Sequence, residues 1–570
     1  MRFTTRPIYS LIVMIACMGL VSVPPSRPSH AQSSPDAPLI APLAGVPDLS
    51  TWLLGQPYGN TVGAYNFAEV WYRAGQGLHF GVDFAAPCGV EVVAVADGTV
   101  RAVDDMGFGS APHNVIVSHD ALGMSSLYGH LLASPLVRAG QYVSQGEVLG
   151  FSGDPDETCT SRPHLHFELR SLDYRYTLNP TPFMGLNWHT LALLGPFGLP
   201  LFQQDVYNPR QWQTLYDQPE VVFWGSRLNA YAQSDPPLGR NRPVPTVAIA
   251  RTAPTLEATL PYHARKLAER GCCANPFWHP ADPTRLYITD GAGGGLGSVF
   301  AWDVAEGAML NILQTAPRPY FSPDGKYRLG LRADGLVALS DDVGNALTVL
   351  DTGGRIPTIN PASTHLLWTV TDEVATAGQP QPLSHVMLSK LDGTDAREVW
   401  AQTSTSAQWL DDTHILIQTS EDRITTLYSY SIITGEGVEL GRFYSLRHLS
   451  VAPGGERLMF VLTFQEDPAQ NGVYLMEMKA PPQAQRLAWV GAWRWRDAHS
   501  VYYIPFDPTQ PYHDVRAVDL ISGVDVSIWD GNAERTAIAD GYWEVSADGE
   551  RIAFRNVDDL QLTILEPMIP

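Results

Sequence analysis

The segment PHLHFELRS, from Pro163 to Ser171, places two histidines and a glutamate at alternate positions. Residues i and i+2 of a β-strand point to the same face, so His164, His166 and Glu168 are expected on one side of a strand. The chain has only 16 histidines in 570 residues, which makes so close a pair a candidate for shared chemistry. One interpretation is a polar row on the solvated face of a strand, and the other is two imidazoles directed at one point.

A second segment, HFGVD, places His79 and Asp83 four residues apart with Gly81 between them. On a strand these three residues would also share a face, and Gly81 would leave space above it. Two imidazoles and one carboxylate suit zinc, because catalytic zinc sites use three protein ligands and keep a fourth position for water. The two segments offer four candidates, so one histidine would remain for proton transfer. His130, in the segment SSLYGHLL, is a further candidate.

These residues fall within a stretch that predicts an all-β domain. Between residues 77 and 170, short runs rich in Val, Thr, Tyr and Phe are broken by glycine, as in VEVVAVADGTVRAV and QYVSQGEVLGFSG. Such runs are typical of short strands, and helical periodicity is absent. The order HxxxD, YGH and HxH within one β-rich stretch favours a common site over chance.

Over about residues 75–172 the chain resembles the lysostaphin/LytM family of zinc peptidases, in ADGTV and the flanking glycines as well as in the ligand pattern. The resemblance implies an open all-β sandwich that binds Zn²⁺ through His79, Asp83 and His166. It also implies that His130 and His164 assist catalysis, and that the substrate is a peptide bond in the bridges or stems of bacterial peptidoglycan. Near these residues, Glu168 would either orient a ligand or be a solvated side chain.

One segment departs from the family pattern. Family members usually run through Gly, Ser and Thr into Pro-His-x-His, whereas GDPDETCTSRPHLHFE is longer and acidic and has Arg162 where glycine is common. This loop should border the substrate groove. It contains Cys159, and Cys88 follows the segment of Asp83, so we predict a disulfide between the two cysteines; a pair of free thiols is the alternative.

The N-terminus predicts export. Arg2 and Arg6 precede the apolar run IYSLIVMIACMGLVSV, and Ser29-His30-Ala31 fits a small-x-small cleavage pattern, so residues 1–31 are expected to be a signal peptide. An uncleaved anchor is the alternative, although the run is shorter than the about 20 residues of a membrane span. The protein is therefore expected to be secreted or to lie in the cell envelope. The net charge of -22 disfavours nucleic-acid binding.

Residues 246–570 contain a repeated pattern, in which a bulky residue precedes a polar turn and a β-run follows. Seven copies lie 38 to 50 residues apart, with the bulky residues Trp278, Phe321, Ile359, Trp409, Val451, Trp495 and Val545. A period of about 40–50 residues with about four strands per unit is typical of β-propeller blades. The copies resemble the TolB-like propeller repeat, whose Ser-Pro-Asp-Gly turn is complete only at residues 322–325. We expect seven blades, with six blades or an irregular array of β-sandwiches as alternatives.

The last copy ends at LQLTILEPMIP, short of an outer strand. A propeller ring must close, because an open ring leaves an edge strand exposed. The segment PTVAIAR, residues 245–251, lies just upstream of the first copy and is predicted to supply the missing strand.

The sequence thus predicts an all-β chain in five parts: a signal peptide (1–31), a linker (32–50), a LytM-type zinc peptidase domain (51–185), a connector (186–245) and a TolB-like β-propeller (246–570). The predicted function is an exported zinc metalloendopeptidase of peptidoglycan, with a propeller that binds a protein or polymer. Two alternatives stay open: a non-catalytic scaffold or activator of other wall hydrolases, and a propeller receptor with an accessory peptidase. The adjacent cysteines Cys272 and Cys273 receive no assigned partner.

Overall fold

The computed structural model describes most of the predicted peptidase and propeller. The described residues are 37–61, 63, 64, 67, 71–194, 214–226, 253, 255, 256, 262–267, 274–290, 298–313, 320–332, 334–372, 382–479 and 482–568. The predicted signal peptide, the predicted closing strand at residues 245–251, and Cys272 and Cys273 lie outside them. Within the described residues, no helix is both long and apolar enough to cross a membrane.

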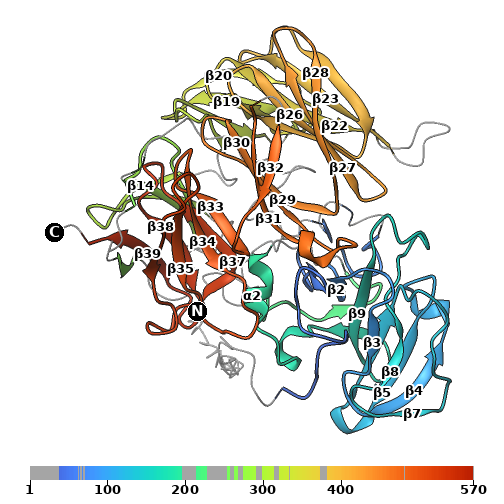
Figure 1. Cartoon of the computed structure of the whole chain (residues 1–570). Helices are drawn as coiled ribbons and strands as arrows, with labels where there is room; N and C mark the ends of the chain where they lie inside the picture. Colours follow the sequence, from blue (N-terminus) through green and yellow to red (C-terminus); the bar gives the residue numbers. More distant parts are fainter. Residues whose placement is uncertain are drawn as a thin grey trace, which may run out of the picture. The chain divides into compact units, whose positions relative to one another are not determined.

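The N-terminal part is built on a nine-stranded sheet, drawn in blue to green in Figure 1. The main path of the sheet runs β1 (Leu53–Gln56), β2 (Val82–Ala85), β9 (His164–Ser171), β6 (Met124–Gly129), β5 (Val115–His119), β4 (Gly98–Val103) and β7 (Tyr142–Val143). β10 (Tyr176–Leu178) continues from β9 and pairs with β11 (Val221–Val222), while β3 (Glu91–Val93) and β8 (Val148–Phe151) form a separate pair. Every pairing in this sheet is antiparallel. Asp83 lies on β2, and His164 and His166 lie on the neighbouring strand β9.

Alternation along these strands builds the core. Leu165 and Phe167 on β9 and Phe84 on β2 are fully buried, as predicted for the residues between the histidines. They join one apolar cluster with Trp52 and Trp188. Burial of side chains of this size stabilises the fold by about 1.5–3 kcal/mol each, which holds the two strands in one register.

Residues 37–49, which the sequence analysis assigns to a linker, pack on the folded chain instead. Leu39 and Leu43 are 1% and 2% exposed, and they form bridges with Met184 and Val92. The prediction of a linker is wrong for these residues. Their Pro- and Ala-rich composition resembles a linker, but a few leucines within reach of an apolar cluster are enough to anchor them.

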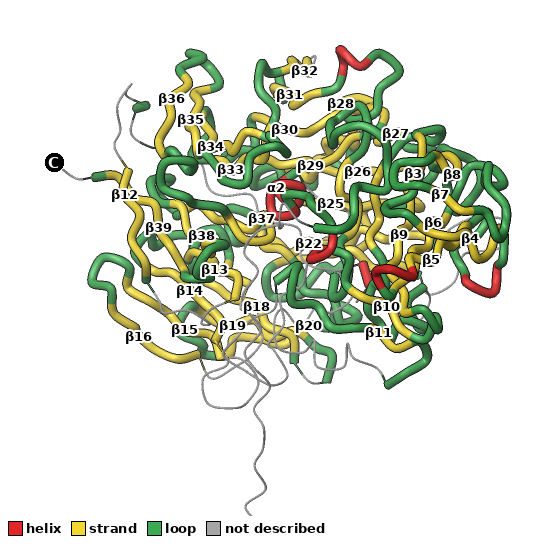
Figure 2. Tube along the Cα trace, turned by 90° about the horizontal axis from the view of Figure 1, so that it is seen from below, coloured by secondary structure: helices red, strands yellow, loops and turns green. Residues whose placement is uncertain are grey.

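Seven four-stranded antiparallel sheets make up the rest of the described chain, which confirms the predicted propeller and its seven blades. Figure 2 colours their strands yellow. The first three blades are β13 (Ala274–Trp278), β14 (Arg285–Asp290), β15 (Ser298–Asp303) and β16 (Ala308–Leu313); β17 (Tyr320–Phe321), β18 (Tyr327–Leu331), β19 (Val337–Asp341) and β20 (Ala346–Leu350); and β21 (Thr358–Ile359), β22 (His365–Thr371), β23 (Leu383–Lys390) and β24 (Arg397–Thr403). The next three are β25 (Thr405–Trp409), β26 (His414–Glu421), β27 (Ile424–Ser431) and β28 (Gly437–Tyr444); β29 (Leu446–Val451), β30 (Arg457–Leu462), β31 (Gly472–Glu477) and β32 (Gln483–Arg486); and β33 (Gly491–Trp495), β34 (Ser500–Pro505), β35 (Val515–Asp519) and β36 (Asp525–Trp529). The last blade combines β37 (Ile538–Val545), β38 (Ile552–Asn556) and β39 (Leu562–Pro567) with the upstream strand β12 (Tyr262–Lys266).

The seven bulky residues of the repeat have one structural role. Each is the last residue of the first strand of its blade, directly before the polar turn to the second strand. Trp409, for example, ends β25 and is 1% exposed. The repeat in the sequence therefore marks the end of the first strand of every blade.

The ring is closed by β12, which pairs with β39 along five residue pairs from Tyr262–Pro567 to Lys266–Thr563. Closure by an upstream strand was predicted, but the strand is residues 262–266 and not residues 245–251. The segment PTVAIAR alternates apolar residues more clearly than YHARK does, so local pattern favoured the wrong segment. Tyr262 is the buried residue of β12, and its hydroxyl lies 2.8 Å from that of Tyr502 in the preceding blade.

The connector begins with the helix α2 (Trp188–Leu193), all of whose residues are buried. Trp188 joins the core of the nine-stranded sheet, whereas His189 accepts a hydrogen bond of 2.9 Å from the backbone amide of Asp540 in β37. Gly541 lets the two backbones approach, because a Cβ at this position would lie 2.5 Å from the carbonyl oxygen of Ala192. α2 therefore packs against both the sheet and the last blade.

We expect that a proline in β12 destabilises the protein more than a proline in an ordinary outer strand. Ala264→Pro would break the pairing with β39 and open the ring, whereas Val438→Pro in β28 would disturb only one blade edge. Thermal unfolding of the full chain should show a larger fall in Tm for Ala264→Pro, corresponding to about 2 kcal/mol or more. Equal falls in Tm would mean that closure does not depend on β12.

Candidate active site

Two neighbouring strands bring Asp83 and His166 together. In the pairing of β2 with β9, Asp83 lies opposite His166, and Ala85 lies opposite His164. His166 Nδ1 is 2.7 Å from Asp83 Oδ1, and His164 Nε2 is 3.7 Å from the same oxygen. The interpretation that the two histidines point to one place, and not to solvent, is therefore the one that the structure supports.

His79 reaches the site from outside β2. The strand begins only at Val82, and His79 instead forms an isolated bridge with Gly59 through two backbone hydrogen bonds of 2.7 and 2.8 Å. The expectation that one strand carries both His79 and Asp83 is therefore wrong. His79 Nδ1 donates to the carbonyl of Pro57 at 2.8 Å, which directs Nε2 toward Asp83 Oδ1 at 3.2 Å.

His79, Asp83 and His166 form a group that can hold a metal ion. One donor atom of each lies within 4.8 Å of the others, and His79 Nε2 is 3.4 Å from His166 Nδ1. Gly81 makes room for this arrangement, because a Cβ there would lie 2.6 Å from His166 Cε1. An imidazole–imidazole–carboxylate set of this kind fits a divalent transition metal.

Glu168 orients His166 and is not solvated. Its side chain is fully buried, and His166 Nε2 donates to Oε1 at 3.2 Å, which leaves Nδ1 for a metal. Arg170 Nε donates to Oε2 at 2.6 Å, so the buried carboxylate is paired on both sides. Burial would raise the pKa of Glu168, but the charge of Arg170 and the hydrogen bond from His166 lower it below its ordinary value. The alternative of a solvated glutamate is wrong.

Burial and pairing also set the charges of Asp83 and His166. Burial opposes ionisation of Asp83, yet the neighbouring charges of His79 and His164 hold its pKa well below its ordinary value. Burial would lower the pKa of His166, but its hydrogen bonds to Asp83 and Glu168 outweigh that effect and raise the pKa to about 9. A proton and a metal ion therefore compete for His166 Nδ1.

The other two histidines lie beside this group. The rings of His130 and His164 are 4.9 Å apart, and the ring of His130 is 5.8 Å from that of His166. His164 Nδ1 donates to the carbonyl of Arg162 at 2.6 Å, and His130 Nδ1 donates to the carbonyl of Ala111. Nε2 of each ring is therefore not used in these hydrogen bonds. Burial lowers the pKa of both, and the charges of His164 and His166 help to lower that of His130 to about 3.

The divergent loop before β9 is organised by Asp154. This residue is 1% exposed, and its carboxylate accepts hydrogen bonds from the backbone amides of Asp156, Ser161 and Arg162 at 3.0–3.1 Å. Burial would raise the pKa of Asp154, but these hydrogen bonds lower it. The sequence analysis noted the acidic loop but did not single out Asp154. In the sequence it is an ordinary aspartate, and the three amides that it binds lie two, seven and eight residues later.

The predicted disulfide between Cys88 and Cys159 is present, with Cα atoms 5.9 Å apart, which confirms the pairing over two free thiols. It ties this loop to the segment after β2. Arg162 extends from the same loop over the ring of Trp71, with the guanidinium 4.8 Å from the ring centroid.

Tyr72 is a further neighbour that the sequence analysis missed. Its ring lies 5.6 Å from that of His79 with an interplanar angle of 82°, and its hydroxyl donates to Gln56. Burial, and secondarily the charge of Asp83, raise the pKa of Tyr72 above its ordinary value. The phenol thus stays protonated and can donate a hydrogen bond.

Comparison with known proteins places this site in a family. Residues 77–180 match the model of Peptidase family M23. The chain contains an M23 peptidase domain. This finding confirms the predicted lysostaphin/LytM resemblance for that part of the chain.

Two curated relatives match a short stretch of this chain. The DD-carboxypeptidase/endopeptidase Mpg of Neisseria meningitidis serogroup B is 42% identical over 94 residues, which cover 16% of this chain and 20% of that protein. Lysostaphin of Staphylococcus simulans is 29% identical over 110 residues, covering 19% and 22%. The solved catalytic domain of lysostaphin is 24% identical, with a TM-score of 0.19 over 23% of this chain and 89% of that one. The chain thus spans about a fifth of the length of these curated relatives.

We expect Glu168→Gln to weaken metal binding by about 10- to 100-fold, because the amide holds His166 less firmly and leaves Arg170 without its charge partner. Competition with a chromophoric chelator measures this affinity. Glu157→Gln is the matched control, since Glu157 is exposed in the loop before β9. Equal affinities for the two variants would rule out an orienting role for Glu168.

Proposed function

We propose that this protein is an exported zinc metalloendopeptidase that hydrolyses peptide bonds in bacterial peptidoglycan. His79, Asp83 and His166 would hold the zinc, and His130 and His164 would handle protons during hydrolysis. The observation that carries the proposal is the convergence of His79 Nε2, Asp83 Oδ1 and His166 Nδ1 within 4.8 Å, with two more imidazoles alongside.

The hydrogen bonds of the ligands support this assignment. His79 Nδ1–H donates a hydrogen bond to the carbonyl of Pro57, and His166 Nε2–H donates one to Glu168 Oε1. Each imidazole therefore presents the lone pair of its other nitrogen toward Asp83. When bound, the zinc ion supplies polarisation of the scissile carbonyl and a water of lowered pKa.

His130 and His164 would carry out the proton transfers of the reaction. Burial keeps both imidazoles neutral near pH 7, and both rings have Nδ1–H committed to a backbone carbonyl. Each free Nε2 can therefore accept a proton from the attacking water and return it to the leaving amine. Because the rings lie 4.9 Å apart, one group can act at each of these two steps.

The substrate class is inferred from relatives. Mpg is named a DD-carboxypeptidase/endopeptidase, and a Vibrio cholerae relative that is 37% identical over 91 residues is named a peptidoglycan DD-endopeptidase. A wall substrate requires an extracytoplasmic location, which agrees with the expected signal peptide and with the disulfide of the loop. The propeller would bind a partner or position the peptidase on the wall.

Digestion of defined muropeptides with mass readout tests the proposal. The wild type should contain one zinc and cleave a peptide bond, and a chelator should abolish cleavage. His130→Ala and His164→Ala should keep the zinc and lose about 10²–10⁴-fold in rate. His113→Ala is the matched control, because the His113 side chain pairs with Asp104 and not with a residue of the proposed site, so the rate should stay unchanged.

Loss of zinc in His130→Ala or His164→Ala, with zinc retained in His166→Ala, would overturn the assignment of the ligands. A zinc-loaded wild type that cleaves no muropeptide would favour a non-catalytic activator of other wall hydrolases.

Zinc binding should weaken as pH falls. His166 has a pKa of about 9, so below that pH each bound zinc must displace one proton from this residue. The apparent affinity should therefore fall by up to about tenfold per pH unit between pH 8 and 6. Calorimetry in buffers with different ionisation enthalpies measures the released proton directly, and zinc binding without proton release would contradict the prediction.

A further inference from the structure

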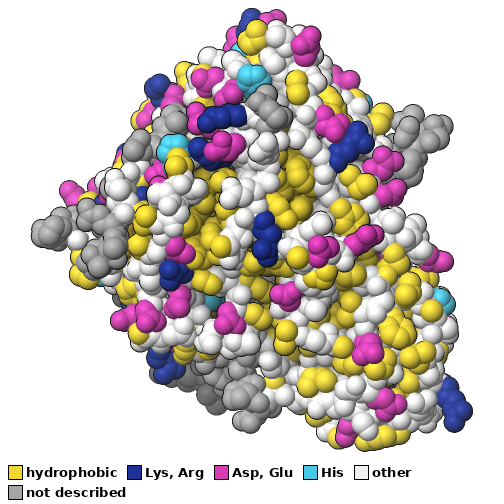
Figure 3. Space-filling view, in the orientation of Figure 1, with side chains coloured by type: hydrophobic (Ala, Val, Ile, Leu, Met, Phe, Trp, Pro, Cys, Tyr) yellow, Lys and Arg dark blue, Asp and Glu magenta, His cyan; other side chains and the backbone are white. Residues whose placement is uncertain are grey.

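Three arginines and a histidine gather near the inner strands of three consecutive blades. Arg423 lies in the turn between β26 and β27, Arg447 and His448 lie on β29, and Arg494 lies on β33. The chain as a whole carries a net charge of -22. On the face seen in Figure 3, Lys and Arg side chains are scattered among Asp and Glu.

The three arginines contact aromatic rings and neutral oxygens. Arg447 lies 5.4 Å from the ring centroid of Phe464, and Arg423 lies 5.9 Å from the same ring while it donates to Ser445 Oγ at 2.9 Å. Arg494 donates to two backbone carbonyls, of Trp543 and Trp493.

Among the described residues, no carboxylate lies within ion-pair distance of any of the three arginines. All three are partly buried. Arginines of folded proteins are seldom withdrawn from water without an acidic partner, because the charged form is then poorly solvated. Burial and the neighbouring charge of Arg423 lower the pKa of Arg447 to about 10, which reflects this missing partner.

The backbone is held in an unusual conformation to present these groups. Arg423, His448 and Phe464 are not glycines, yet their φ angles are 64°, 56° and 55°. The register of β29 against β30 shifts between Arg447 and Ser450, which marks a β-bulge. Bulges redirect side chains, and left-handed backbone at bulky residues is retained mainly where a site needs it.

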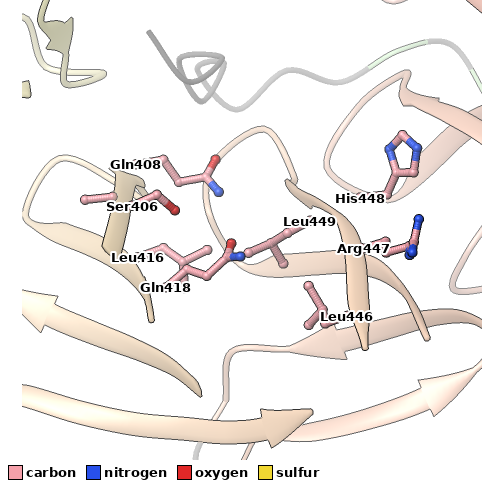
Figure 4. Close-up of a pocket in the computed structure, with 9 residues that line it drawn as sticks. Ser406, Gln408, Leu416, Gln418, Leu446, Arg447, His448 and Leu449 are labelled. Atoms are coloured by element: carbon pink, nitrogen blue, oxygen red, sulfur yellow. The ribbon is translucent and has the colours of Figure 1, made fainter. Parts of the chain in front are cut away.

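A cavity of about 210 Å³ adjoins the cluster, between β25 and β26 on one side and β29 on the other. Figure 4 shows the amides of Gln408 and Gln418 directed toward β29, with Leu449 facing them and with Arg447 and His448 side by side beyond that strand. His448 Nε2 is buried and has no hydrogen-bond partner among the described residues. The cavity is large enough for the terminal group of a ligand. The cations lie beside it, and the side-chain amides can form hydrogen bonds with a peptide group.

We propose that the propeller binds a carboxylate at the end of a peptide, held by Arg447 and Arg423 around Phe464. The planar guanidinium fork matches a carboxylate through paired hydrogen bonds. The anion relieves the repulsion between the two arginines, while Gln408 and Gln418 contact the adjoining peptide group. This site lies on the propeller. Its turn with Arg423 contacts the loop before β9, because Thr160 Oγ1 donates to Asp422 Oδ1 at 3.4 Å.

Calorimetric titration of the full chain with trialanine, trialanine amide, sodium acetate and inorganic phosphate tests the site. Trialanine should bind at least about tenfold more tightly than its amide, and Arg447→Gln and Arg423→Gln should each lose about tenfold or more. The matched control is Arg442→Gln, because Arg442 is an exposed arginine of β28 already paired with Glu439. This control should keep wild-type affinity.

Tighter binding of trialanine than of acetate assigns the carboxylate to a peptide terminus, and equal binding assigns it to a small free acid. Equal affinity for trialanine and its amide, or wild-type affinity in both Arg447→Gln and Arg423→Gln, overturns the site. Tighter binding of phosphate than of trialanine also overturns it. The Tm of each variant shows whether it is folded. If Arg447→Gln does not fold, Arg423→Gln, which lies in a turn and not within a strand, tests the site.

Discussion

The antiparallel register of β2 on β9 is the constraint on which the site depends. It sets Asp83 opposite His166 and leaves Phe84, Leu165 and Phe167 in the core. A slip of one residue would exchange the two faces and put the apolar side chains where the metal group lies. Burial of the apolar residues thus positions the imidazoles and the carboxylate, although none of the core residues takes part in chemistry.

A second condition is that buried charges at this site are paired. Glu168 lies between His166 and Arg170, and Asp83 lies among three histidines. In surroundings that exclude water, these hydrogen bonds decide which ring nitrogen carries a proton and which is free for a metal. Orientation and protonation of His166 therefore come from one network, and a change at Glu168 would reach the metal group without touching it.

Around Arg447 in the propeller, buried charges lack, among the described residues, the acidic partners that are present at the peptidase site. There the aromatic ring of Phe464 and the neutral oxygens of Ser445, Trp493 and Trp543 surround guanidinium groups that no described carboxylate pairs. The rigid ring permits this, because seven blades closed by β12 on β39 can support locally unfavourable backbone and charge. The same closure covers the edge of β39.

The sequence by itself singled out the residues that the structure brings together around Asp83, and it predicted the seven blades. Both depend on local patterns that can be recognised in the sequence. These are the spacing of His79 with Asp83 and of His164 with His166, and the bulky residue before each turn. The tertiary structure alone decided that His79 lies outside β2, that Glu168 is buried, that Asp154 organises the loop, that residues 37–49 pack and that residues 262–266 close the ring. Each of these depends on contacts between residues far apart in the chain, where burial and pairing outweigh local composition and alternation.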